Sequence, residues 1–155
     1  MATTNPADRS KPSNRKKARN LLVQALYQWQ LSGTDISVIE AEFFTDNAMN
    51  KVDTAYFREL LHGIPARVGE LDERLMPFLD RTQGELDPVS LAVLRIGTYE
   101  LLFRIDVPYR VAINEAVNLA KSYGPSEAHR YINGVLDKVA ANSRQAEIRA
   151  SRSGA

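Results

Sequence analysis

The residues best suited to binding a ligand lie near the N-terminus, where four basic side chains fall within five positions: Arg15, Lys16, Lys17 and Arg19. Residues 1–19 hold six basic side chains and one acidic side chain, whereas residues 20–140 hold 11 basic and 17 acidic ones. A basic arm on an acidic body is typical of a segment that binds a polyanion. Charge alone equally allows a solvated tail that only aids solubility.

Gln24 and Tyr27 add groups that could contact nucleic-acid bases. Apolar residues between Ala18 and Trp29 recur at the spacing of one buried helix face. At about 100° per residue, Tyr27 lies almost opposite this apolar stripe, on the polar face that also holds Lys16 and Gln24. Two interpretations stay open at this point. The ring packs against a second half of the protein, or it stacks on a base of single-stranded RNA.

Arg130 and Tyr131 form a weaker second candidate, within the last helix that the apolar pattern predicts. Arg130 points away from the apolar stripe of that helix, and Tyr131 lies at its margin. A boundary tyrosine with a solvated hydroxyl is common in proteins that bind no RNA. Spacing alone therefore favours packing over RNA binding for this pair.

Motifs of common catalytic and metal sites do not occur. The absence of cysteine excludes disulfides, thiolate nucleophiles and iron–sulfur clusters. The two histidines, His62 and His129, lack the spacing of a zinc-binding or facial-triad motif, and the scattered glycines form no phosphate-binding loop. We therefore expect no catalytic residues, no metal and no cofactor. A hydrolase or nuclease that uses carboxylates with one of the histidines is a weak alternative.

The elements that must position these residues are predicted to be helices. A first helix over residues 15–31 ends at Ser32-Gly33, and Thr34 or Asp35 caps a short second helix. Asp53 caps a longer helical segment, in which Pro65 and Gly69 predict a kink or break.

In the second half of the chain, Asp87-Pro88 is a strong helix start, and residues 88–104 are apolar on nearly every side. This helix should be the central one, because other helices must cover all of its faces. Pro108 precedes a helix to about Tyr123, and Ser126 caps a last helix to about residue 142. No alternating strand pattern occurs.

The predicted class is all-α, a compact bundle of about seven helices around a central apolar helix. We expect one helical domain over residues 14–143, between a disordered leader (1–13) and a disordered basic tail (144–155). No apolar run is long enough to span a membrane, and the N-terminus does not resemble a secretory signal. A cytoplasmic protein is the expectation.

Five runs of residues are recognisable together: RKKAR (15–19), VQALYQWQ (23–30), VLRI (93–96), VPYRVAINEA (107–116) and NGVLDK (133–138). They resemble the NusB antitermination family, in register over about residues 15–140. The resemblance implies an all-helical fold of two helical halves. It also implies a protein that pairs with NusE, a ribosomal protein of the small subunit.

The resemblance further implies a function without catalysis. The NusB–NusE pair binds the boxA element of nascent ribosomal RNA leaders, acts in the RNA polymerase antitermination complex and supports rRNA maturation. Residues 15–19 would then bind phosphates through their four basic side chains, while Gln24 and Tyr27 contact bases. Arg130 and Tyr131 match family positions that also touch RNA.

The chain departs from this family pattern in part. Lysine at positions 16 and 17 weakens bidentate phosphate binding, which arginine provides better. The chain ends without the methyltransferase domain to which NusB-like domains are sometimes fused, which favours a free-standing factor. The residues leave open which face binds NusE and whether the chain forms a homodimer. They also leave open a protein-interaction scaffold whose basic arm is incidental.

Overall fold

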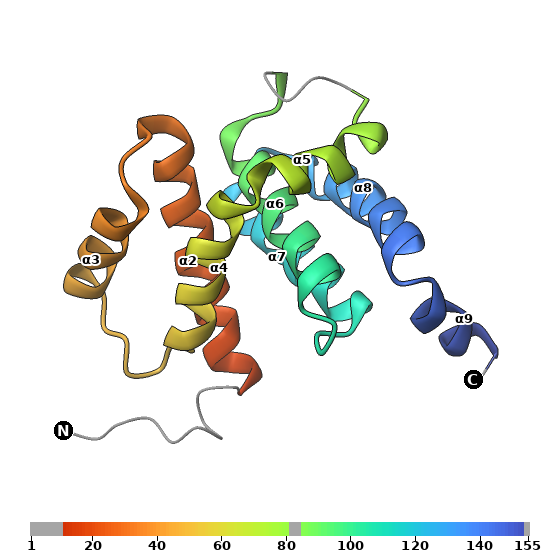
Figure 1. Ribbon diagram of the computed structural model, residues 1–155, viewed down its shortest axis with the longest axis horizontal. Helices are drawn as coiled ribbons and strands as arrows, with labels where there is room; N and C mark the ends of the chain where they lie inside the picture. Colours follow the sequence, from red (N-terminus) through yellow and green to blue (C-terminus); the bar gives the residue numbers. More distant parts are fainter. Residues whose placement is uncertain (1–10, 81–84, 154–155) are drawn as a thin grey trace. The chain divides into compact units, whose positions relative to one another are not determined.

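The computed structural model describes residues 11–80 and 85–153. These residues form eight α-helices and one short 3-10 helix, with no β-strand among them. By its contacts the chain divides into two compact units, Met1–Arg67 and Val68–Ala155. The helices are labelled in Figure 1: α2 (Pro12–Ser32), α3 (Ile36–Asp46), α4 (Thr54–Ala66), α5 (Val68–Leu75), η1 (Met76–Phe78), α6 (Pro88–Phe103), α7 (Tyr109–Tyr123), α8 (Ala128–Ser143) and α9 (Gln145–Ser153). The predicted all-α class is confirmed.

In the first unit, α2 ends and α3 begins at the terminating and capping residues that the sequence predicted. Gly33 ends α2 in the left-handed conformation, with φ of 68°. The carboxylate of Asp35 accepts a hydrogen bond from the Ser37 amide at 2.8 Å and so caps α3. Ile39 of α3 is fully buried, and the Phe43 and Phe44 rings lie 6.1 and 6.0 Å from the Phe57 ring of α4. These contacts make α3 a cover for α4.

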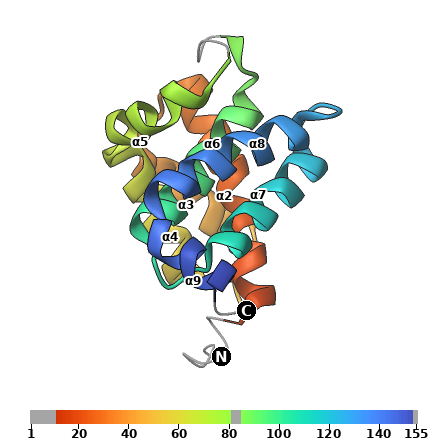
Figure 2. The same cartoon turned by 90° about the vertical axis from the view of Figure 1, so that its right-hand side faces the viewer.

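In the second unit, α6 is the central helix, as predicted. Residues 92–101 are all buried, and α5, α7 and α8 pack around them. Figure 2 shows α8 and α7 running beside α6. Gly97 allows the closest approach, because a Cβ there would lie only 2.6 Å from Leu136 Cδ1 of α8. The start of α6 is capped as expected, since Asp87 Oδ2 accepts from the Ser90 amide at 2.9 Å.

The prediction of a disordered tail over residues 144–155 is wrong for residues 144–153. Residues Gln145–Ser153 form α9, and the Arg144 side chain before it is buried, with 3% of the residue exposed. Its guanidinium donates to the carbonyls of Leu101, Glu100, Arg104 and Val107 at 2.8 to 3.1 Å. These carbonyls lie at the end of α6 and in the turn after it, where the last carbonyls of a helix have few helical partners. The Glu100 and Arg104 carbonyls also accept from the Arg104 and Val107 amides. Arg144 is therefore a structural residue rather than a solvated charge.

Two further boundaries differ from the predictions. Pro12 and Ser13 belong to α2, because proline is well suited to the first turn of a helix, so the leader is shorter than expected. Residues 1–10 of the predicted leader lie outside the described residues. Ser126 does not cap α8; Glu127, with φ of 70°, directly precedes that helix and provides no side-chain cap.

None of the described helices is both long enough and apolar enough to cross a membrane.

Candidate nucleic-acid interface

The four basic residues at the start of α2 differ in exposure. Lys16 and Lys17 are exposed to solvent, Arg15 is half-buried and Arg19 is buried. Helix periodicity explains the difference, because Arg15 and Arg19 are four residues apart and share the face that is turned toward α4. The arginines and lysines of this segment therefore have separate roles.

Arg15 and Arg19 both lie against Tyr56 of α4. Their guanidinium carbons are 4.2 and 5.5 Å from the centre of the Tyr56 ring, within the range of a cation–π contact. Only 3% of Arg19 is exposed. In this structure Arg19 fastens α2 to α4, and the phosphate contact that the resemblance implies for it stays a prediction.

Asp53 completes the attachment of α2 to α4. It caps α4 by accepting from the Tyr56 amide at 3.1 Å, and its other carboxylate oxygen lies 3.4 Å from Arg15 Nε. Its own amide donates to the Asn14 carbonyl at 3.1 Å. The sequence identified Asp53 only as a cap. The arginine contacts that it shares with Tyr56 were missed, because they join positions about 40 residues apart.

Lys16, Gln24 and Tyr27 are all exposed along one face of α2. We call this face, which also includes Asn20 and Lys17, the α2 ridge. The Asn20 amide donates to the Lys16 carbonyl at 2.9 Å, and the Gln24 amide donates to the Asn20 carbonyl at 3.0 Å. Tyr27 is 40% exposed. The outward orientation predicted for its ring is confirmed.

In the second unit, Arg130 and Tyr131 also differ in exposure. Arg130 is exposed on α8 and forms an ion pair with Glu127 at 2.8 Å, in which both side chains are solvated. Such a pair contributes little to stability, so Arg130 can exchange this partner for a phosphate. Tyr131 is half-buried, and its hydroxyl accepts a hydrogen bond from the Asp80 amide at 3.3 Å. Its ring therefore links α8 to the segment after η1.

The described residues contain no group of three or more histidine, aspartate or glutamate side chains that could hold a metal ion. His62 instead pairs with Glu40 on the surface, at 2.8 Å between Nε2 and Oε1. The pKa of Arg110 is raised. The Tyr109 hydroxyl accepts from Arg110 Nε at 3.1 Å and raises the pKa of that guanidinium above its ordinary value.

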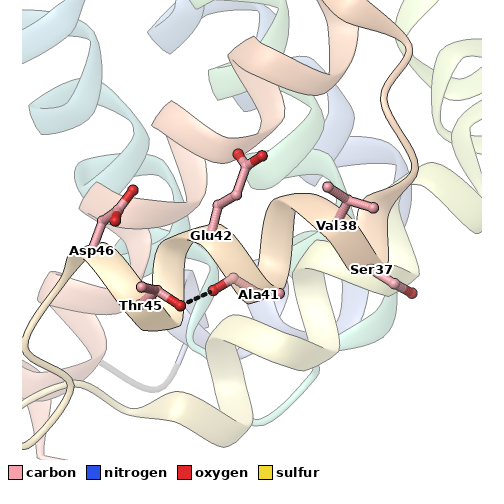
Figure 3. A pocket seen from close by; sticks show the side chains of 6 residues that line it. All are labelled: Ser37, Val38, Ala41, Glu42, Thr45 and Asp46. Atoms are coloured by element: carbon pink, nitrogen blue, oxygen red, sulfur yellow. Dashed lines mark hydrogen bonds between the residues drawn. The ribbon is translucent and has the colours of Figure 1, made fainter.

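One surface hollow, of about 450 Å³, lies on the outer face of α3, where Val38 and Glu42 point the same way (Figure 3). Val38 is 48% exposed, and the Thr45 hydroxyl donates back to the Ala41 carbonyl at 2.9 Å. The lining is mostly apolar and shallow, so it offers few groups for orienting a ligand. A second hollow, beside α9, is described below.

Comparison with known proteins identifies the family. A model of the NusB family matches residues 16–141. The transcription antitermination protein NusB of Pseudomonas putida (strain GB-1) is 53% identical over 150 residues, which cover 95% of this chain and 90% of that protein. The NusB protein of Saccharophagus degradans is 57% identical over 141 residues, covering 90% of this chain and 94% of the relative.

Solved structures agree with this match. NusB of T. maritima superposes with a TM-score of 0.77 at 25% identity, covering 96% of this chain and 99% of that one. A structure of antitermination factors NusB and NusE in complex with dsRNA gives a TM-score of 0.76 at 26% identity, covering 85% and 99%. The matched relatives are named for transcription antitermination. The chain belongs to the NusB family of transcription antitermination factors.

Proposed function

We propose that this protein acts with NusE on the boxA element of nascent ribosomal RNA, within the RNA polymerase antitermination complex. It would thereby support rRNA transcription and maturation in the cytoplasm, where transcription takes place in bacteria such as those of its relatives. The observation that carries the proposal is the exposed α2 ridge, in which an aromatic ring, an amide and two lysines share one surface. The solved structure of a related NusB with NusE and dsRNA supports NusE and RNA as the partners.

Each residue of the proposed interface has a role that its chemistry allows. The ammonium groups of Lys16 and Lys17 bind phosphates, and the Tyr27 ring stacks on a base. Gln24 hydrogen-bonds a base edge by exchanging its contact with the Asn20 carbonyl. On α8, Arg130 binds a phosphate and the exposed part of Tyr131 contacts a nucleotide.

Arg15 and Arg19 position this interface rather than forming it. Both guanidinium groups lie on Tyr56, and Arg15 also contacts Asp53. The half-buried Arg15 keeps enough exposure to contribute to the local positive potential. The buried Arg19 does not face the proposed RNA.

The test is a titration of boxA-type RNA into the co-purified complex of this protein with NusE, at several salt concentrations. Three phosphate contacts, from Lys16, Lys17 and Arg130, predict that log K falls with log salt at a slope of about −2 on single-stranded RNA. Binding that does not depend on salt, or no binding even with NusE present, would refute the proposal. Measuring the mass of the complex also shows whether the chain forms a homodimer.

A further inference from the structure

A second hollow lies where the start of α7, the end of α8 and α9 meet, all in the second unit. Its volume is about 640 Å³, and α9 follows directly from α8 (Figure 1). We call it the C-terminal groove, which is lined by Tyr109, Asp137, Ala141, Gln145, Ile148, Arg149 and Arg152. We propose that the C-terminal groove is a second contact site for single-stranded RNA, which receives the flank of the RNA bound elsewhere on the protein. This inference rests on the proposed function.

The wall formed by α9 is fixed in place. Glu147 accepts from the Tyr109 amide at 2.9 Å and also pairs with the buried Arg144. One turn further on, Arg110 Nη2 donates to the Ser151 hydroxyl at 3.0 Å. Since these bonds tie α9 to the start of α7, the groove is preformed and a ligand need not order it.

Two cations of this wall are available for a ligand. Arg149 and Arg152 are three residues apart, so they lie on the same face of α9, and both are exposed. Within the described ranges, 11–80 and 85–153, neither guanidinium has a hydrogen-bond or ion-pair partner. Asp137 is the single acidic residue of the lining. Two adjacent guanidinium groups favour an anionic ligand with repeated charges, such as a phosphodiester backbone.

The rest of the lining favours RNA over an acidic protein segment. Tyr109 offers a half-buried ring and Gln145 an exposed amide, which are groups that contact bases. An acidic peptide needs neither of them to satisfy its carboxylates. The groove therefore combines phosphate-binding and base-contacting groups, as the α2 ridge does.

The groove is also continuous with a residue of the proposed interface. Arg130, Asp137 and Ala141 are spaced i, i+7 and i+11 on α8, so they fall on one helix face. All three are exposed. The 11 residues from Arg130 to Ala141 correspond to about 16 Å along the helix. An RNA strand bound at Arg130 therefore reaches the groove by following this face of α8.

Most of the cationic wall lies beyond the residues that the family model matches. That match ends at residue 141, whereas Gln145, Arg149 and Arg152 follow it.

The experiment compares two RNAs, a boxA-type element alone and the same element with a single-stranded extension at each end. Both are titrated into the complex with NusE, using wild type, Arg149→Gln/Arg152→Gln and the control Lys51→Gln/Arg74→Gln, which removes two positive charges elsewhere. We expect the groove variant to bind the short RNA like wild type and the extended RNA more weakly. Its salt slope on the extended RNA should be less negative by about 1.4, from two lost phosphate contacts.

A charge-conserving variant, Arg149→Lys/Arg152→Lys, should restore most of the salt slope, and circular dichroism checks that all variants keep their helix content. Unchanged binding of the extended RNA by the groove variant would overturn the inference, while loss of binding in Tyr27→Ala would leave the proposed function intact. An equal loss on both RNAs, or a loss of NusE binding alone, would also overturn it. Failure of wild type to bind either RNA would refute the proposed function itself.

Discussion

The chain has a basic segment at the start of its helical region and another at its end, and the two use their cations in the same two ways. At the start, Arg15 and Arg19 pack on Tyr56 while Lys16 and Lys17 remain in solvent. At the end, Arg144 is buried while Arg149 and Arg152 are exposed. A charge count treats all of these side chains alike.

In both segments the buried cations are arginines, which has a physical cause. A planar guanidinium has five N–H donors and can satisfy several acceptors at once, which lets arginine join two helices at low cost. Arg144 does so with four carbonyls, and Arg15 does so with a carboxylate and an aromatic ring. The cations left in solvent are the ones that we propose bind RNA.

The strongest test of this comparison is Arg144→Ala. We expect a loss of about 3–5 kcal/mol in the free energy of unfolding, because the substitution removes the donor to the Leu101 and Val107 carbonyls and the ion-pair partner of Glu147. Urea denaturation followed by circular dichroism measures this loss. The matched control is Arg149→Ala, an exposed arginine of α9 that should change stability by less than about 0.5 kcal/mol. Equal effects would show that burial does not distinguish the two arginines.

Tyr27→Ala tests the aromatic part of the α2 ridge. We expect RNA affinity to fall by about 1–3 kcal/mol, because one base loses its stacking partner. The variant should stay folded, since the ring is not part of the buried core. Tyr27→Phe should keep most of the affinity, because the ring and not the hydroxyl contacts the base. Wild-type affinity in Tyr27→Ala would exclude stacking at this position.

Local signals predicted most of the fold. The caps at Asp35, Asp53 and Asp87, the helix end at Gly33 and the uniformly apolar α6 all depend on residues a few positions apart. These signals locate helix ends without knowledge of the packing. The outward direction of Tyr27 was predictable for the same reason, because it follows from helix periodicity alone.

Long-range contacts were not predictable in this way. α9 was predicted to be disordered, because Arg144 and Glu147 become structural only through partners about 40 residues away. The burial of Arg19 likewise depends on Tyr56 in another helix. Sequence periodicity did not separate Arg19 from the lysines, since a charged residue beside a basic run is ordinarily exposed.

The smallest expected effect distinguishes Lys17 from Arg19, two residues of the same basic segment. Lys17→Gln should make the salt slope of RNA binding less negative by about 0.7, the contribution of one phosphate contact to a single strand. Its urea midpoint should stay at the wild-type value, because the side chain is exposed.

Arg19→Gln should behave in the opposite way, because its guanidinium lies over Tyr56 and is buried. We expect a lower urea midpoint and an unchanged salt slope at temperatures where the variant is folded. If Arg19→Gln instead made the salt slope less negative by as much as Lys17→Gln does, Arg19 would have to leave Tyr56 to reach a phosphate. Binding would then include rearrangement of the contact between α2 and α4, and the separation of structural arginines from RNA-binding lysines would fail at this position.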